Sequence, residues 1–227
     1  MMEVPSILLK SVITLPLPID IAGGGIILSR TEINLRGRSA NMDAGAIAKR
    51  LRLPKVAQLG FVVADMDKAI AWYKDTAGVR PWMLMDERPE PCLERGKEVH
   101  PVLRIALAYS GPMQMELIQV TEGESFHLAR VKDSPGGVHH FGFLVGDLER
   151  RLTACRAMGV DVLQRGTIRD TGMVIDYAYL DTLSEAGTYF ELIRWRFGPL
   201  PMPVNSLSFR LLARLGGSTV FKGRVIG

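Results

Sequence analysis

The sequence predicts an α+β fold made of two copies of one strand–helix–strand–strand–strand unit, written βαβββ. The segment VAQLGFVVAD at residues 56–65 is echoed by VHHFGFLVGD at residues 138–147, with Val, Gly, Phe, Val and Asp at the same offsets. A second pair, MELI at residues 115–118 and FELI at residues 190–193, follows in the same order. Such a repeat indicates two supersecondary units that pack together, so polar residues at equivalent places should converge on a shared centre.

The first copy begins with a strand over residues 56–64, which are rich in β-branched and aromatic side chains. Asp65 can cap the helix that follows, and the apolar residues from Ala69 to Tyr73 are spaced for one helical face. Gly78 is expected to end this helix.

The remainder of the first copy is predicted to form strands around one long connection. Residues 86–98 are charged and twice interrupted by proline, which predicts a mobile loop. Strands over residues 102–109 and 113–120 follow, and the Ser-Gly-Pro sequence between them is typical of a hairpin turn. The copy therefore has the order strand, helix, then roughly three strands.

The second copy repeats this pattern. A strand is expected over residues 138–145, and Asp147 can cap a helix that stops at Gly159. The last two strands are expected at about residues 173–180 and 187–195.

The repeat divides the chain into four parts. Residues 1–50 have no repeat partner, so we expect an N-terminal extension that is poorly ordered. The two βαβββ modules occupy residues 51–130 and 131–198. Residues 199–227 are expected to form a basic C-terminal tail with a short helix.

Composition limits the classes of protein to consider. With 47% hydrophobic and 23% charged residues, the chain is typical of a soluble globular protein. Cys92 and Cys155 lie far apart without metal-binding spacing, which argues against a disulfide framework and suits a reducing compartment. No stretch reaches the roughly 18 uninterrupted apolar residues of a membrane span, and the N-terminus lacks the basic start of a secretory signal. We therefore expect a cytoplasmic protein.

The tail carries the excess of positive charge. Six basic residues and no acidic residue follow Glu191, while the net charge of the chain is +4. A solvated flank is the simplest interpretation, because the tail has neither interleaved aromatic residues nor a long Lys/Arg block for nucleic acid. A helix capped by Asn205 or Ser206 would turn Leu207 and Leu211 toward the domain or a second subunit.

Alternation along the strands places the polar residues of the repeat on one face of the sheet. In each first strand the more hydrophobic face should lie under the helix, which leaves a polar residue and a glycine on the opposite face. In each last strand a glutamate opposes the leucine that follows it. The concave face is therefore predicted to carry Gln58, Glu116, His140 and Glu191, all of which can ligate a divalent metal.

These features resemble the vicinal oxygen chelate superfamily, which includes glyoxalase I, methylmalonyl-CoA epimerase, extradiol dioxygenases and bleomycin-resistance proteins. The resemblance covers about residues 55–197 and implies the glyoxalase-like fold, in which two βαβββ modules form a cupped, eight-stranded mixed sheet around one divalent metal. The family takes one ligand from the first and one from the last strand of each module. The metal ligands implied here are Gln58, Glu116, His140 and Glu191.

The ligand types narrow the activities that the resemblance allows. An extradiol dioxygenase needs two histidines and a carboxylate around iron, and Gln58 stands where the first histidine would be. The oxygen-rich set suits Zn, Ni, Co, Mn or Mg. Glutathione-binding members resemble one another in three polar anchors, and Val62, Val120 and Gly136 take those places here, which argues against glutathione conjugates. The glyoxalase- and epimerase-like branch remains.

We predict a metal-dependent lyase or isomerase that transfers a proton next to the carbonyl of a small oxo acid, thioester or similar substrate. Glu116 and Glu191 would move the proton, while Gln58 and His140 would mainly hold the metal. The alternative is a non-catalytic protein that sequesters a hydrophobic or aromatic molecule in the cup.

Each site residue also has a structural explanation. A histidine next to His139 can be a hydrogen-bonded core residue, and glutamine is a poor ligand. His139 itself has the wrong parity for the cavity and is expected to support the site. In a metal-free protein, Arg104 or Arg194 could pair with the buried glutamates. The expected partners are a small-molecule substrate and, by resemblance, a second copy in a homodimer, with no nucleic acid and no membrane.

Overall fold

The structure, a computed structural model, describes residues 49–133, 137–202, 204–214 and 223–227. The expected N-terminal extension lies almost entirely outside the described residues. Within the described part of the chain, no helix has the length and apolar character needed to cross a membrane.

The first module has the predicted βαβββ order. Its helix begins where Asp65 accepts a hydrogen bond from the backbone N–H of Lys68 at 3.0 Å, and it ends at Gly78, whose left-handed backbone (φ 63°) suits glycine. The elements are β1 (Gln58–Val62), α2 (Met66–Ala77), β2 (Trp82–Glu87), β5 (Val102–Ser110) and β6 (Met113–Glu122).

The second module repeats this order with one local difference. Asp147 stands at the start of the helix, but its carboxylate accepts hydrogen bonds from the side chains of Arg150 and Arg151 and does not cap the backbone. The elements are β7 (His140–Leu144), α4 (Leu148–Ala157), β8 (Val162–Asp170), β9 (Met173–Leu180) and β10 (Tyr189–Phe197).

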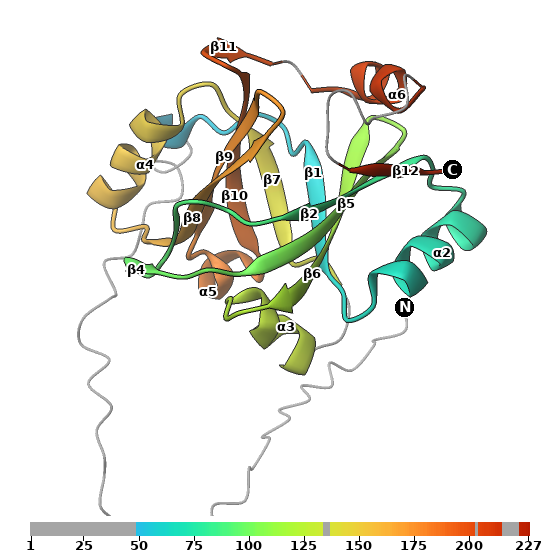
Figure 1. Cartoon of the computed structure of the whole chain (residues 1–227). Helices are drawn as coiled ribbons and strands as arrows, with labels where there is room; N and C mark the ends of the chain where they lie inside the picture. The colour runs from blue at the N-terminus through green and yellow to red at the C-terminus, as the bar shows by residue number, and fades with distance from the viewer. Residues whose placement is uncertain (1–48, 134–136, 203, 215–222) are drawn as a thin grey trace, which may run out of the picture. The chain divides into compact units, whose positions relative to one another are not determined.

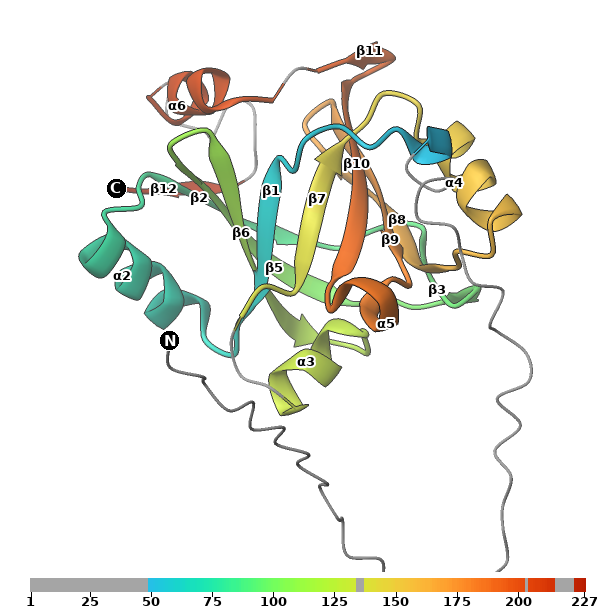
Figure 2. The same cartoon turned by 180° about the vertical axis from the view of Figure 1, so that it is seen from behind.

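The two modules join edge to edge in one mixed sheet. β1 lies parallel to β6, β7 lies parallel to β10, and the two first strands, β1 and β7, pair antiparallel at the centre (Figures 1 and 2). This arrangement confirms the predicted α+β, glyoxalase-like sheet. It also places all four strands with predicted ligands next to one another, in the order β6-β1-β7-β10.

The sheet is larger than the eight strands expected from the two modules. It contains twelve strands within the described residues, because four short strands extend it. β12 pairs with β2, β11 pairs with β10, and β3 and β4 continue beyond β8. The short strands are β3 (Cys92–Glu94), β4 (Lys97–Glu98), β11 (Leu200–Pro201) and β12 (Arg224–Ile226).

The prediction of a mobile loop over residues 86–98 is wrong. This segment includes the end of β2 and both β3 and β4, and β3 pairs with β8 of the other module. Backbone bonds flank the pairing, since the N–H of Glu90 donates to Thr167 at 2.8 Å and that of Arg95 donates to Leu163 at 2.7 Å. The connection therefore ties one end of the sheet to the other.

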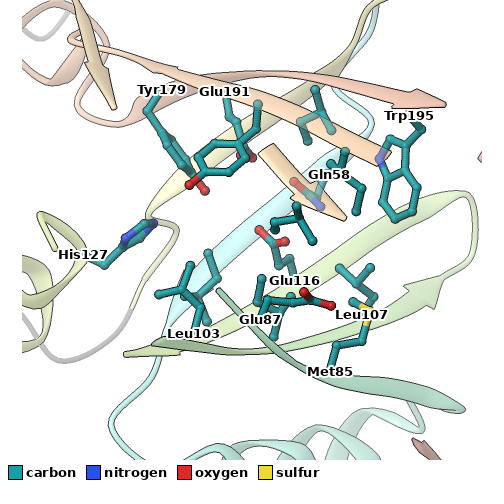
Figure 3. A pocket seen from close by; sticks show the side chains of 16 residues that line it. Gln58, Met85, Glu87, Leu103, Leu107, Glu116, His127, Tyr179, Glu191 and Trp195 are labelled. Carbon is teal, nitrogen blue, oxygen red and sulfur yellow. The ribbon is translucent and has the colours of Figure 1, made fainter. Parts of the chain in front are cut away.

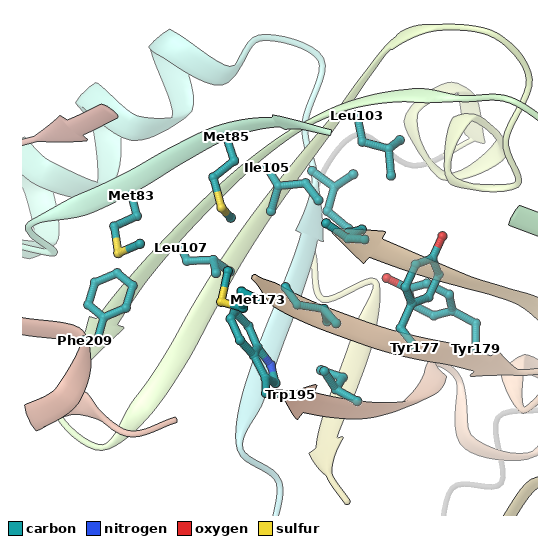
Figure 4. Packing of buried hydrophobic residues seen from close by; sticks show 14 of the residues in the cluster. Met83, Met85, Leu103, Ile105, Leu107, Met173, Tyr177, Tyr179, Trp195 and Phe209 are labelled. Atoms are coloured by element: carbon teal, nitrogen blue, oxygen red, sulfur yellow. The ribbon is translucent and has the colours of Figure 1, made fainter. Parts of the chain in front are cut away.

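The hydrophobic core consists of three clusters that follow the predicted faces. Phe61 and Leu117 pack under α2, whereas Phe143 and Leu192 pack under α4. The third cluster fills the concave face, which we call the cup, and runs from Met83 and Phe209 to Tyr177 and Tyr179 (Figure 4). The cup is thus apolar over most of its surface.

In the described part of the chain, three more helices have no counterpart in the other module, and the last of them corrects a prediction. They are α3 (His127–Asp133), α5 (Leu183–Ala186) and α6 (Ser206–Arg214). Asn205 caps α6 by accepting hydrogen bonds from the N–H groups of Leu207 and Ser208, both at 3.0 Å. However, Leu207 and Leu211 are exposed, and it is Phe209 that packs onto the cup, with its ring 5.2 Å from that of Tyr109.

Candidate metal centre

The structure brings the predicted residues of the repeat together in the middle of the sheet. Glu116, His140 and Glu191 are buried, and their potential ligand atoms lie within 4.8 Å of one another. The His140 Nε2 atom is 3.1 Å from the Oε2 atoms of both Glu116 and Glu191. Gln58 is also buried and lines the same cavity as the two glutamates (Figure 3).

Two glycines make room for this cluster. In the pairing of β1 with β7, Gly60 lies opposite His140 and Gly142 lies opposite Gln58. A Cβ atom on Gly60 would stand 1.8 Å from the His140 ring, and one on Gly142 would stand 2.6 Å from the Gln58 Oε1 atom. Each glycine therefore provides the space that the polar side chain of the other module occupies.

Neighbouring side chains orient two of the four groups. The Gln58 Nε2 atom donates to the Gln114 Oε1 atom at 2.9 Å, and Gln114 Nε2 in turn donates to the Tyr109 hydroxyl at 3.3 Å. The Nδ1 atom of His140 is 3.1 Å from Nδ1 of His139, the residue whose parity predicts a supporting role. These contacts leave Gln58 Oε1 and His140 Nε2 for the site, as outer contacts of metal ligands commonly do.

The charges of the cluster are unbalanced. Burial lowers the pKa of His140, but the charge of Glu191 and the contacts with both glutamates outweigh burial and raise this pKa to about 9. Burial raises the pKa of Glu116, although contact with His140 opposes the shift. Even with a protonated imidazole, two carboxylates would leave a net negative charge in a buried place, which is costly unless a cation balances it.

The donor atoms fit a divalent cation. Within the described residues, four of these buried atoms have no hydrogen-bond partner, and the His140–carboxylate contacts lack the alignment of hydrogen bonds. The atoms are Gln58 Oε1, Glu116 Oε2, His140 Nε2 and Glu191 Oε2. Three oxygens and one imidazole nitrogen form a set that zinc, manganese, nickel or cobalt accepts. Glu116, His140 and Glu191 could therefore hold a metal, and Gln58 stays the predicted fourth ligand.

The basic residues considered as alternative partners of the glutamates are engaged elsewhere. Arg104 donates to Asp86 on β2 at 3.0 Å, and Arg194 donates to Asp176 on β9 at 2.8 Å. Neither arginine lines the cavity beside the glutamates. Among the described residues, the charge of the buried carboxylates can therefore be balanced by His140, by a proton on Glu116, whose pKa burial raises, or by a bound cation.

A cavity opens from the candidate metal centre into the cup. The cavity is small, with a volume of about 40 Å³ open to the centre of a water-sized sphere. Most of the walls are apolar, with Leu103, Leu107 and Ile193 among them, while His127, Tyr179 and Trp195 add polar groups (Figure 3). The cavity therefore has an apolar interior with Gln58, Glu116 and Glu191 in its wall, a character typical of sites for small organic groups.

Two residues of the site are missing from the prediction based on sequence. Gln114 has the same strand parity as Glu116, so the alternation rule could have assigned it to the concave face. His127 begins α3, which lies between the modules and outside the repeat, and no spacing in the sequence marks it.

The sequence matches the model of a known protein superfamily. Residues 57–179 match the sequence model of the Glyoxalase/Bleomycin resistance protein/Dioxygenase superfamily. The chain therefore belongs to this superfamily. No curated protein sequence matches the chain.

Solved structures with a similar fold include methylmalonyl-CoA epimerases. The enzyme from Mycobacterium tuberculosis is 20% identical, with a TM-score of 0.45 over 71% of this chain and 93% of its own. A variant of the Streptomyces coelicolor enzyme, in complex with 2-nitronate-propionyl-CoA, is 21% identical, with a TM-score of 0.44 over 62% of this chain and 96% of its own. A hypothetical protein from Bacillus halodurans C-125 is 19% identical, with a TM-score of 0.45 over 61% and 92% of the two chains. These likenesses leave the function of this chain to be inferred from the residues of its site.

Proposed function

We propose that this protein is a metal-dependent enzyme that transfers a proton at a carbon next to a carbonyl group. The reaction would be an isomerisation, an epimerisation or a related lyase step on a small oxo acid, thioester or similar substrate. The observation that carries the proposal is the convergence of four buried donor atoms, otherwise without hydrogen bonds among the described residues, at the base of an apolar cavity.

A divalent metal held by Glu116, His140 and Glu191, with Gln58 as fourth ligand, would stabilise the negative charge that develops on the carbonyl oxygen when the adjacent C–H bond loses its proton. The protein supplies the remaining parts of the site. The apolar walls exclude water, and His139 and Gln114 keep the ligand side chains in their orientation.

The positions of the two glutamates support a role in proton transfer. Glu116 comes from the last strand of the first module and Glu191 from the last strand of the second, and the Oε2 atom of each lies 3.1 Å from His140 Nε2. A carboxylate on one side of a bound substrate can accept the proton, and the other can return one. Both line the cavity, so a ligand there can reach either of them.

An exchange experiment tests this function across several classes of candidate substrate at once. The zinc- or manganese-loaded protein is incubated in D₂O with a panel of 2-oxo acids and acyl thioesters, and proton NMR follows the signal of the carbon-bound hydrogen next to the carbonyl. We expect enzyme-dependent loss of this signal for at least one compound class. Glu191→Gln should slow the exchange by about 100-fold or more, the usual scale for general acid–base groups.

Matched variants separate proton transfer from metal binding. Glu122→Gln, on the exposed end of the same strand as Glu116, should leave exchange unchanged. Metal content is measured for each variant, because Glu191→Gln also alters a ligand. Unchanged exchange in a Glu191→Gln protein that retains its metal would refute the proton-transfer role.

A second candidate function is supported by the apolar character of the cavity. A protein that only sequesters a hydrophobic molecule would also use walls such as Leu103, Leu107 and Trp195. It would not need two buried carboxylates beside the cavity, each with one oxygen that has no hydrogen-bond partner among the described residues. Ligand binding without metal and without exchange of any carbon-bound hydrogen would favour this alternative.

A further inference from the structure

His127 is a buried imidazole that neither the repeat nor the metal centre explains. It is 1% exposed and lines the cavity (Figure 3). Its Nε2 atom is buried and has no hydrogen-bond partner among the described residues. A buried polar atom without a partner is unfavourable, so an unpaired one in a cavity wall points to a ligand group.

A hydrogen-bond chain behind His127 begins with an amide of fixed orientation. Gln164 is fully buried, and its Oε1 atom accepts a hydrogen bond from the Tyr177 hydroxyl at 3.3 Å. Its Nε2 atom donates to the Glu94 carboxylate at 3.0 Å and to the Ser125 hydroxyl at 3.3 Å. A flipped amide would place an oxygen against a carboxylate, so the Nε2 atom must face Glu94 and Ser125.

The chain then sets the tautomer of His127. The Ser125 Oγ atom, which accepts from Gln164, lies 2.7 Å from the His127 Nδ1 atom. Within the described residues, this Nδ1 atom is the one acceptor that the Ser125 proton meets, so the hydroxyl donates to it. A neutral imidazole that accepts at Nδ1 carries its hydrogen on Nε2. His127 therefore carries an N–H donor on its buried Nε2 atom, in a residue that lines the cavity.

The other walls favour the same kind of ligand. The Nε1 atom of Trp195 is a second buried N–H donor in the lining without a partner among the described residues (Figure 3). The lining contains no lysine or arginine among the residues that the structure describes. Two neutral N–H donors suit oxygens of a ligand that accept hydrogen bonds.

We propose that His127 is a specificity-determining residue that donates its Nε2 hydrogen to an acceptor oxygen of a carbonyl- or ether-bearing ligand in the cup. This rests on the proposed function only in taking the cavity as the ligand site. It applies equally to an enzyme and to a protein that only binds its ligand.

The tautomer is tested directly by nitrogen NMR of the zinc-loaded full-length protein with labelled histidines, and His127→Gln assigns the signals. We expect a neutral His127 ring with hydrogen on Nε2 at neutral pH. Ser125→Ala should shift the ring toward the other tautomer, because Nδ1 loses its donor. Hydrogen on Nδ1 in the unchanged protein, or a charged ring, would overturn the proposal.

Ligand preference is tested with two probes of equal shape, cyclohexanone and methylenecyclohexane, which differ by an acceptor oxygen. Ligand-observed NMR on the zinc-loaded protein should show tighter binding of the ketone. His127→Phe should weaken ketone binding about fivefold and leave the hydrocarbon unchanged, the scale of one neutral hydrogen bond. His127→Gln, which keeps an N–H donor, should recover part of the preference, and His100→Phe at an exposed position is the matched control.

Equal binding of the two probes, failure of both to bind, or a ketone preference that survives His127→Phe would refute the donor role. The same binding measurements on protein treated with a metal chelator show whether the ketone preference depends on the metal. They therefore test the role of His127 separately from the proposed enzymatic function. A His127-dependent preference without metal-dependent proton exchange would retain the inference and reject the enzyme. Metal-dependent proton exchange without a His127-dependent ketone preference would support the proposed enzyme and refute the donor role of His127.

Discussion

At the scale of single residues, the centre depends on two side chains that cross between the modules. His140 lies over Gly60 of the other module, and Gln58 lies over Gly142. This exchange explains why a glycine stands two residues from each polar group in the repeat. The absence of a side chain is as necessary for the site as the ligands are.

Substitution of these glycines tests this geometry. In Gly60→Ala, the new methyl group would stand 1.8 Å from the His140 ring, so the ring or the β1–β7 pairing must move. We expect a loss of roughly 1–3 kcal/mol in the free energy of unfolding, as is usual for overpacking, and weaker zinc binding. Denaturant unfolding and a zinc titration measure the two effects.

Gly146→Ala is the matched control, because nothing lies within 4 Å of a Cβ atom built there. It should leave both zinc affinity and stability nearly unchanged. A Gly60→Ala protein with the zinc affinity of the unchanged chain would show that His140 does not need this place.

The four candidate ligands could be predicted from the sequence because strand parity and the repeat apply to each of them. Gln58 and His140 share one offset, and Glu116 and Glu191 share another. His127 could not be predicted in this way, since its position depends on where α3 packs after the first module ends. A residue outside a repeat has no equivalent position that would reveal its role.

At the scale of elements, Asp176 joins three strands of the second module. From β9 it accepts hydrogen bonds from Thr167 on β8 at 3.1 Å and from Arg194 and Arg196 on β10, both at 2.8 Å. Burial raises its pKa, but the hydrogen bonds with Arg196 and Arg194 outweigh burial, and the pKa is lowered below the usual value of 3.8.

This ion pair makes the stability of the module depend on pH. Because the folded-state pKa of Asp176 is lowered, its contribution is fully present above pH 3.8 and is lost as the pH falls through the folded-state pKa. Asp176→Asn should therefore cost about 1.5–3 kcal/mol at pH 7, the scale of hydrogen bonds to a charged group, and progressively less in acid. Denaturant unfolding at a series of pH values measures this difference.

Asp75→Asn, on the exposed face of α2, serves as the control and should behave like the unchanged chain at every pH. A difference between Asp176→Asn and the unchanged chain that persists at the lowest pH would contradict the assignment.

The strand β3 is the element for which the prediction from sequence differs most from the structure. Its charged, proline-interrupted surroundings predict a loop, yet it pairs with β8 because Glu94 accepts hydrogen bonds from the Phe126 N–H and from Gln164, both at 3.0 Å. The sequence does not distinguish a charged side chain that is hydrogen-bonded to a distant segment from one that is exposed to water. The same limit applies to α6, where Phe209 instead of Leu207 turned out to face the cup.

Hydrogen exchange tests whether β3 is a stable strand. The amide of Arg95, which donates to Leu163 at 2.7 Å, should exchange far more slowly than an unstructured amide. Glu94→Ala removes the acceptor for two donors and should speed exchange at Arg95, while the amides of β6 remain protected. Fast exchange at Arg95 in the unchanged chain would mean that this connection is a loop after all.

At the scale of the whole molecule, each of the two modules contributes two of the four residues of the candidate centre. Gln58 and Glu116 come from the first module, and His140 and Glu191 come from the second. The repeat was sufficient to predict this division and the overall sheet. It could not predict the added strands at the sheet edges, and the cytoplasmic location and homodimer expected from the sequence stay predictions.

The most direct test of a shared metal centre is the metal content of protein that was purified without added metal and then dialysed. Elemental mass spectrometry measures this content. The proposed centre predicts close to one divalent ion per chain, and loss of that ion in the Glu116→Gln/Glu191→Gln double variant. A well-folded protein that holds no stoichiometric metal, even after incubation with zinc or manganese, would contradict the central claim.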